Sequence, residues 1–548
     1  MLKRTLSVLL GALCIVLLAV FYSVIRPAET AEDAPMETES PTYENQYNPE
    51  GATTLAFSED GISVTGPGVS IENRRATIVY PGTYRLVGSA SDAGLIVNCE
   101  YDGVVYLILD NVDITCPDGP AVYVRQADKT VLVLPDNTQS VLQDGESYQT
   151  FSVPEGKSQP EGAIYSCDDL SLCGSGCLTV LGQYAHGICC RDGLELEDCS
   201  VTVDAVCDGI HVKEAAVLQS VNVTITAGED GIQSYGTDTM EGCIQIQESL
   251  VSILADGDAI AAANDLQLSN TELTASTAGG FENYKAIALY DYSAKGLKAD
   301  SITLDDSTVL LDTADDSIHA GNLVSIMNTA VQVSSGDEGI QCDGAVILDG
   351  GELWITESYE GIRAADLQLA NIRLMIASED DAITQTAEQG RCVFDIGCEV
   401  SITSGGCCCR TAGTLCLYGG TVYASSNSEH HAMLDIASAE YRDGAAIFTG
   451  MGDWTEPNPV PTVSSFYYAG ADSFAANAEI SLYDAAGPVI EYKAPQPFRQ
   501  LVILAGEGQN NNYTLQINGE SIASNDGGYG SDEPASAEAS EEPTDESM

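Results

Sequence analysis

Apolar and polar residues alternate along the middle of the chain, and the alternation recurs with a nearly constant period. Leu194-Glu-Leu196 and Val201-Thr-Val203 are followed one repeat later by Val221-Asn-Val223-Thr-Ile225. Alternation with period two is typical of strands that have one buried face. These segments show no helical spacing, which argues against leucine-rich, ankyrin and TPR repeats.

A small residue followed by Ile marks each repeat. The Ile residues of this motif are Ile164, Ile188, Ile210, Ile232, Ile260, Ile287, Ile318, Ile340, Ile362 and Ile383. Their successive spacings are 24, 22, 22, 28, 27, 31, 22, 22 and 21 residues, and the longer ones indicate loops inserted at one turn. A period near 22 with three short strands per coil predicts an all-β fold, the right-handed parallel β-helix, in which stacked coils share one core. Val331, Leu353 and Leu374 are expected to stack inside it.

The period sets the expected domain boundaries. Residues 51–450 form the predicted parallel β-helix, and residues 451–523, where the period stops, form a C-terminal β module that caps its open end. Residues 27–50 are expected to be a disordered linker, and residues 524–548 a disordered acidic tail.

The first 26 residues predict export from the cell. Lys3 and Arg4 precede an apolar run from Leu6 to Ile25, as in a secretory signal. The run also has the ~20 residues that span a bilayer. Residues 1–26 are therefore a cleaved signal peptide or an uncleaved N-terminal membrane anchor. Either way, the rest of the chain is expected to be extracellular, secreted or held at the cell surface.

The charge balance restricts the partners. Lys and Arg number 21 against 82 Asp and Glu, for a formal net charge of -61. Such a chain repels nucleic acid and attracts divalent cations. The 18 cysteines lack framework spacing and are interpreted as small buried hydrophobic residues, and the five His are not spaced for zinc.

An acidic residue precedes the small-Ile motif in most repeats. These acids are Asp208, Asp230, Asp258, Asp316, Glu338, Glu360 and Asp381. Equivalent positions in adjacent coils lie ~4.8 Å apart, where two carboxylates repel by roughly 3 kcal/mol at an effective dielectric of about 20. Basic side chains are expected to be too few to neutralise this column, so it predicts calcium, which binds oxygen ligands. For any single Asp, capping of its own turn is the alternative.

Several segments resemble one known family. They are Gly82-Thr-Tyr-Arg-Leu-Val-Gly88, Val105-Tyr-Leu-Ile-Leu-Asp-Asn-Val-Asp-Ile-Thr115, Ala163-Ile-Tyr-Ser-Cys-Asp-Asp-Leu170, Gly174-Ser-Gly-Cys-Leu-Thr-Val180, His186-Gly-Ile188 and Gly228-Glu-Asp-Gly-Ile-Gln233. They are similar to the clostridial carbohydrate-binding-domain-containing β-helix proteins, whose shape resembles that of pectate lyases. The resemblance covers about residues 50–520, most specifically 80–235.

The resemblance implies a calcium-containing β-helix, exposed on the cell, that binds cellulose and acidic, pectin-like polysaccharide such as polygalacturonate. Asp168, Asp169, Asp208 and Asp230 lie on matching motif positions. The chain departs from the family in its many cysteines and in its irregular coils at 232–318.

We therefore expect a monomeric, non-catalytic carbohydrate-binding protein. Calcium would bridge uronate carboxylates to the acidic helix, and tyrosines would stack on sugar rings. One alternative is a calcium-dependent pectate lyase, for which Lys213 or Lys285 would be the base. The other is a structural or adhesive stalk that needs no ligand.

Overall fold

The computed structural model describes residues 47–153, 158–238, 241–284, 293–452, 465–484, 486–505 and 513–525. The predicted export segment lies outside these residues, as do nearly all of the linker and of the acidic tail. The first two residues of the predicted tail, Ser524 and Asn525, end a strand. Within the described part of the chain, no helix is long and apolar enough to cross a membrane.

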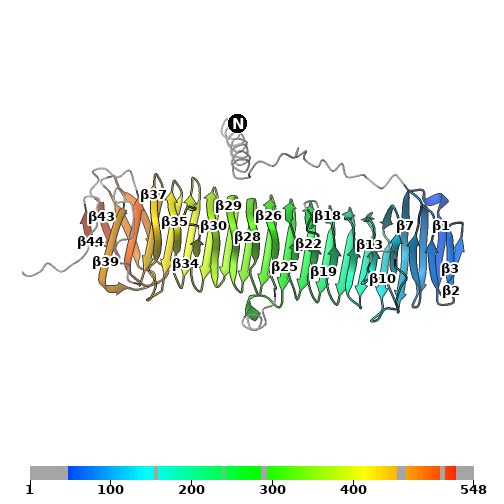
Figure 1. Ribbon diagram of the computed structural model, residues 1–548. Helices are drawn as coiled ribbons and strands as arrows, with labels where there is room; N and C mark the ends of the chain where they lie inside the picture. Colours follow the sequence, from blue (N-terminus) through cyan, green and yellow to red (C-terminus); the bar gives the residue numbers. More distant parts are fainter. Residues whose placement is uncertain are drawn as a thin grey trace, which may run out of the picture. The chain divides into compact units, whose positions relative to one another are not determined.

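The predicted parallel β-helix is confirmed. Consecutive coils pair strand on strand in parallel over most of the chain (Figure 1). The coils present three faces, and several long strands bend around a corner from one face to the next. These corner strands are β5 (Gly82–Ala90), β7 (Val104–Cys116), β26 (Leu297–Asp305), β28 (Ile318–Ser335), β29 (Glu338–Glu357), β30 (Glu360–Ala370), β35 (Cys409–Leu417) and β37 (Leu434–Tyr441).

The remaining strands of the helix each belong to one face. The first face has β6 (Gly94–Asn98), β8 (Val122–Gln126), β11 (Gly162–Ser166), β14 (His186–Cys190), β17 (Ile210–Val212), β20 (Ile232–Ser234), β23 (Ile260–Ala262) and β32 (Ile383–Gln385). The second face has β9 (Lys129–Val133), β12 (Leu170–Cys173), β15 (Leu194–Glu197), β18 (Ala215–Gln219), β21 (Cys243–Gln247), β24 (Asp265–Ser269) and β33 (Arg391–Phe394). The third face has β10 (Gln139–Asp144), β13 (Cys177–Gly182), β16 (Ser200–Ala205), β19 (Asn222–Ala227), β22 (Leu250–Ala255), β25 (Glu272–Thr277), β27 (Thr308–Thr313), β31 (Arg373–Ser378), β34 (Glu399–Ser404), β36 (Thr421–Ser426) and β38 (Ala445–Gly450).

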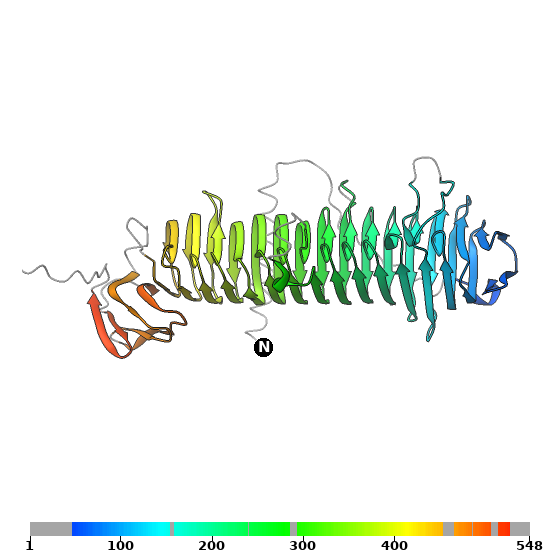
Figure 2. The same ribbon diagram turned by 90° about the horizontal axis from the view of Figure 1, so that it is seen from below.

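Different pairings begin and end the helix. Two antiparallel pairs, β1 (Thr53–Ser58) with β2 (Gly61–Thr65) and β3 (Val69–Glu72) with β4 (Arg75–Ile78), lie at its start. At its end β38 pairs antiparallel with β42 (Phe498–Ala505), which also pairs with β39 (Ser465–Phe474). A separate antiparallel sheet follows, in orange and red in Figure 2, made of β40 (Glu479–Tyr483), β41 (Pro488–Lys493), β43 (Tyr513–Ile517) and β44 (Glu520–Asn525).

The predicted stacking inside the helix is confirmed. Val331 pairs with Leu353, and Leu353 pairs with Leu374 in the next coil. All three side chains are at most 2% exposed. The inward apolar side chains of one coil are covered only when the coils on either side stack against them.

The repeat differs from the prediction at two places. Residues 285–292, which include the predicted Ile287, lie outside the described residues, but Leu297 pairs with both Ile260 and Ile318. Leu297 therefore fills the repeat position, because any branched apolar side chain suits the site. The repeat also continues past Ile383 into β35, where Cys409 pairs with Leu434.

The cysteines serve as core residues, as predicted. All 17 cysteines of the described residues are free thiols, and all but Cys177, Cys207 and Cys243 are buried. Cys408 and Cys409 are fully buried in the main core. A thiol packs there as a small hydrophobic group, which explains how the run 407–409 fits a coil that lacks the small-Ile motif.

A buried row of hydroxyls links the coils where the second face meets the third. The main-chain N–H of Ser249 donates to Thr271 Oγ1 (3.4 Å), that of Thr271 to Ser307 Oγ (3.1 Å), and that of Ser307 to Thr329 Oγ1 (3.2 Å). Each residue just before these turns has a positive φ, as in Asn270 at 48°. The left-handed turn leaves an N–H without a strand partner, and the hydroxyl of the next coil satisfies it.

Thr271→Val keeps the shape of this side chain and removes its hydroxyl. It should lower the free energy of unfolding by about 1–3 kcal/mol, because the buried N–H of Ser249 loses its acceptor. Chemical denaturation would measure the change. Thr274→Val is the matched control, since Thr274 lies three residues further on, in β25, and is exposed. An equal loss in both variants would contradict the role of the hydroxyl row.

Candidate functional site

The acidic residues of the repeat form one column at the turn that enters the first face. Main-chain hydrogen bonds set their alignment: Gly209 N donates to Asp230 O (3.0 Å), and Gly231 N donates to Asp258 O (2.9 Å). The aligned positions, which we call the ladder, are His186, Asp208, Asp230, Asp258, Lys295, Asp316, Glu338, Glu360, Asp381 and Cys407. The predicted acids therefore do stack coil on coil, with His186 before them and Lys295 among them.

Asp168 and Asp169, which the resemblance placed with the metal ligands, lie apart from the ladder. They follow β11, at the corner between the first and second faces. Asp168 Oδ2 accepts the N–H of Ala127 (2.9 Å), and Asp169 Oδ1 accepts that of Gly193 (3.2 Å). Burial, and then the nearby Asp192, raise the pKa of Asp169.

One oxygen of most ladder acids caps the next coil. Asp208 Oδ1 accepts the N–H of Asp230 (2.9 Å), Asp230 Oδ1 accepts that of Asp258 (2.8 Å), and Asp258 Oδ1 accepts that of Lys295 (2.8 Å). Asp316 and Asp381 repeat the pattern toward Glu338 and Cys407, at 3.1 and 2.7 Å. The turn-capping alternative thus applies at these five positions, with the refinement that each acid caps its neighbour's turn.

The second carboxylate oxygen accepts a hydrogen bond from a side chain on a neighbouring strand. Asp230 Oδ2 accepts from Gln233 (2.6 Å), Asp258 Oδ2 from Lys298 (2.9 Å), and Asp381 Oδ2 from Arg410 (2.7 Å). The expectation that basic side chains are too few to neutralise the column therefore needs correction. Few as they are, basic residues gather at the ladder. Lys298 and Arg410 come from the first-face strand of the next coil, beside Asp258 and Asp381, whereas Gln233 lies on the strand that follows Asp230 in its own coil.

Negative charge remains unbalanced around β28 and β29. Carboxylate oxygens of Asp315, Asp316 and Asp337 all lie within 4.8 Å of one another. Burial, and then Asp316, raise the pKa of Glu338 to about 9 and also raise that of Asp337. We call Asp315, Asp316, Asp337 and Glu338 the acidic cluster.

Lys295 places a fixed positive charge beside this cluster, and His319 Nδ1 also lies 2.8 Å from Asp316 Oδ2. Lys295 Nζ lies 2.6 Å from Asp315 Oδ2 and 3.0 Å from Asp316 Oδ2. One ammonium faces four carboxyl groups, so the cluster has the oxygen ligands and the surplus charge that suit a hard divalent cation. In the next coil, Glu360 Oε2 is buried without a hydrogen-bond partner, and Arg363 Nη1 is 3.8 Å away.

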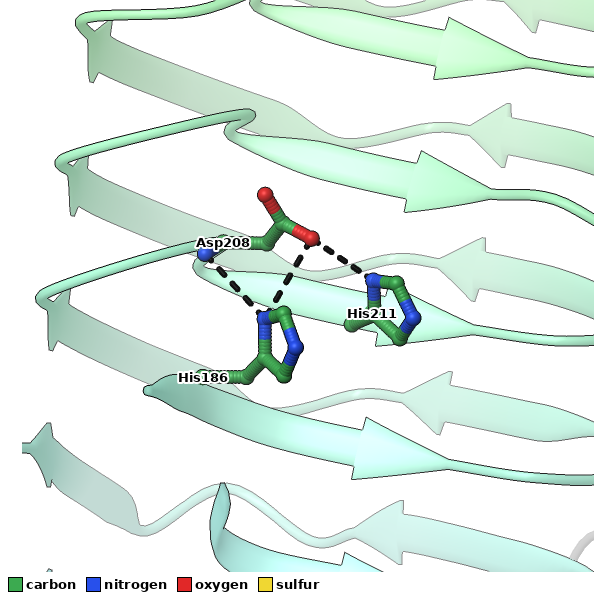
Figure 3. A group of neighbouring side chains, drawn as sticks. All are labelled: His186, Asp208 and His211. Atoms are coloured by element: carbon green, nitrogen blue, oxygen red, sulfur yellow. Dashed lines mark hydrogen bonds and ion pairs between the residues drawn. The ribbon is translucent and has the colours of Figure 1, made fainter. Parts of the chain in front are cut away.

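Two histidines frame Asp208 (Figure 3). His211 Nδ1 lies 2.6 Å and His186 Nδ1 3.3 Å from Asp208 Oδ2. The two imidazoles stack with ring centroids 4.2 Å apart, and Tyr235 stacks on His211 at 4.6 Å. The contacts of Asp208 with His186 and His211 hold the pKa of Asp208 well below its usual range, although burial alone would raise it.

The sequence pattern identified Asp208 but missed this trio. His186 and His211 are 25 residues apart, a separation with no meaning as a metal motif. The separation is one coil of 22 residues plus the three that lead from a ladder position to the following strand. Alignment of the His with the repeat, rather than their spacing in the chain, could have found the pair.

Comparison with known proteins confirms the family resemblance. Residues 72–339 match the family model described as "Carbohydrate-binding domain-containing protein". A protein of that description from Acetivibrio thermocellus is 31% identical over 152 residues, which are 28% of this chain and 52% of the relative. The match thus spans about half the length of that curated relative. A solved structure, the gadolinium derivative of the polysaccharide lyase-like protein from C. thermocellum, is 27% identical with a TM-score of 0.41, and the match covers 46% of this chain and 99% of that one.

The raised pKa of Glu338 gives a pH-dependent prediction. The folded-state pKa of about 9 lies above the ordinary 4.5, so stability from protonated Glu338 is fully present below pH 4.5 and is lost as the pH rises through 9. Glu338→Gln keeps the uncharged form. It should raise the Tm by a few degrees at pH 8 with chelator present, and have little effect at pH 4.

Thermal melts from pH 4 to pH 9 would measure this difference. Glu357→Gln, which changes an exposed carboxylate on the same strand, is the control and should leave the Tm nearly unchanged throughout. If Glu338→Gln raised the Tm by the same amount at every pH, the cluster would not disfavour the charged form of Glu338.

Proposed function

We propose that this chain is an extracellular, non-catalytic protein that binds acidic plant cell-wall polysaccharide, such as polygalacturonate, with the help of calcium. The match of residues 72–339 to a carbohydrate-binding family carries the proposal. The acidic cluster lies inside this matched segment. Export rests on residues 1–26 alone, which are outside the described part of the chain.

The third face supports contact with an extended polymer. A row of side chains points outward from β13, β16, β19, β22 and β25, one in each coil, and all five bear hydroxyls. They pair in register and are Thr179, Thr202, Thr224, Ser252 and Thr274. We call this row the hydroxyl stripe, and all of it but Thr179 is exposed. Hydroxyls both donate and accept hydrogen bonds, as sugar hydroxyls do.

The regular spacing of the stripe favours a polymer over a single sugar. Coils repeat every ~4.8 Å, so a polysaccharide lying along the helix meets the same group again and again. Contacts that are weak singly then add through effective concentration. Exposed tyrosines, such as Tyr80 and Tyr101, whose rings stack at 5.1 Å, offer further apolar faces for sugar rings.

Calcium would add selectivity for acidic sugars. β25 pairs with β27, the next strand of the third face, and β27 leads directly to Asp315. Calcium at the acidic cluster would take its oxygen ligands from Asp315, Asp316 and Asp337. Ligand positions left open would accept a uronate carboxylate, so the cation would join two groups that otherwise repel.

The lyase alternative gains no support from Lys213. Lys213 Nζ lies 2.8 Å from Glu241 Oε1, and this hydrogen bond raises the pKa of Lys213. A lysine that removes a proton must be uncharged at working pH, which requires a lowered pKa. Lys285, the other candidate base, lies outside the described residues.

Retention on insoluble polygalacturonate tests the proposal. The unmodified protein should be retained with calcium and released by chelator. Asp315→Asn combined with Asp337→Asn should weaken calcium-dependent retention at least about tenfold, because two charged ligands are lost. The paired control, Asp204→Asn with Asp256→Asn, removes the same charge from exposed positions and should retain binding.

Two outcomes would contradict this account. Equal retention with calcium and with chelator would remove calcium from the mechanism, and no retention in either condition would favour the stalk. Ultraviolet absorbance from unsaturated products would instead assign the protein to the lyases.

A further inference from the structure

The ladder contains two positions where a histidine, an aspartate and a third side chain meet in the same way. His211 follows Asp208 by three residues, as His319 follows Asp316, and each His Nδ1 lies close to Oδ2 of its Asp, at 2.6 and 2.8 Å. The third member comes from the ladder position one coil earlier. It is His186 for the first trio and Lys295 for the second.

The second trio has a fixed positive charge beside its aspartate. Lys295 Nζ lies 3.0 Å from Asp316 Oδ2, so an ammonium group stands beside the buried carboxylate. The side chain of Asp316 is only 2% exposed, and a buried carboxylate is stable when such a partner is present. The first trio has an imidazole nitrogen, His186 Nδ1, in place of that ammonium.

Three potential ligand atoms converge at Asp208. His186 Nδ1 accepts the main-chain N–H of Asp208 (3.2 Å), and a ring nitrogen that accepts carries a lone pair and no proton. The same nitrogen lies 3.3 Å from Asp208 Oδ2. His211 Nδ1 is the third atom, and all three lie within 4.8 Å of one another. A metal ion bound here would take the lone pair of His186 Nδ1 in place of the N–H of Asp208.

We propose that His186, Asp208 and His211 bind a transition-metal ion of the zinc type. Two imidazole nitrogens and one carboxylate oxygen are the ligands that zinc takes, whereas calcium takes oxygen alone. Asp208 therefore belongs to a different kind of site from the one predicted for it from the sequence.

The surroundings hold the three ligands in place. Asp208 Oδ1 is engaged by the N–H of Asp230 (2.9 Å), which leaves Oδ2 turned toward the imidazoles. The stack of His186, His211 and Tyr235 fixes the ring planes. Such secondary contacts orient metal ligands and add to affinity.

The site has three protein ligands and is not fully enclosed. The side chains of His186, Asp208 and His211 are 11%, 4% and 14% exposed. Zinc is four-coordinate in most protein sites, so three protein ligands leave one position for water or for an oxygen of a bound molecule.

Titration of the metal-free full chain with Zn²⁺ in a calorimeter, in excess Ca²⁺, tests the site. Excess calcium fills the all-oxygen sites, so zinc should still bind stoichiometrically. Co²⁺ should show the visible absorption of a nitrogen-ligated ion. His211→Ala should weaken Zn²⁺ binding at least about tenfold, and so should His186→Lys, which copies the second trio.

Three of the chain's five His supply the controls. His319→Ala and the double change His430→Ala with His431→Ala should leave Zn²⁺ affinity unchanged. Melts without metal would show that His186→Lys is folded. No Zn²⁺ binding to the unmodified chain, displacement of zinc by calcium, or an equal loss in the His319 or His430/His431 variants would overturn the proposal.

Discussion

The fold depends on a hydrogen bond that passes from one coil to the next at each corner. Strand N–H groups find carbonyl partners in the neighbouring coil, but a chain that turns a corner presents N–H groups that no strand accepts. Buried N–H groups without acceptors are costly. In this protein, side chains of an adjacent coil supply the acceptors: the hydroxyls of Thr271 and Ser307 at one corner, and the carboxylates of Asp208 and Asp230 at another.

This constraint determines where charge accumulates. A carboxylate that accepts a turn N–H is held in a buried site, or a half-buried one at Asp230, one coil from the next carboxylate, so capping creates repulsion along the ladder. The chain relieves it locally with Lys298 at Asp258, Arg410 at Asp381, and Lys295 at Asp316. The negative charge of the acidic cluster exceeds what one lysine can balance. Beside Asp208, the imidazole of His186 takes the place that the ammonium of Lys295 takes beside Asp316. Both candidate metal sites thus arise because ladder carboxylates cap the turns of adjacent coils.

The fold could be predicted well from the sequence, because equivalent positions of successive β-helix coils recur at a nearly constant spacing along the chain. The stacking of Val331, Leu353 and Leu374 followed from counting residues. The basic partners Lys295, Lys298 and Arg410 could not be found in the same way, because each comes from another coil than its Asp and inserted loops shift the count. Lys298 contacts Asp258 across 40 residues, and the repeat position is held by Leu297 instead of the expected Ile287. The small-Ile motif ends at Ile383, although the helix was predicted to continue to residue 450, because Cys409 occupies the next Ile position. Burial selects size and polarity, and several residue types satisfy both.

The central claim is that capping and local neutralisation decide which ladder acids are free to bind calcium. A crystal structure of the protein grown with a calcium-mimicking lanthanide, analysed by anomalous scattering, would test it most directly. The account predicts a peak among Asp315, Asp316 and Asp337, and none at Asp258 or Asp381, where Lys298 and Arg410 already hold the carboxylates. Peaks of similar height along the whole ladder, or a peak at Asp381 with none at the acidic cluster, would contradict it.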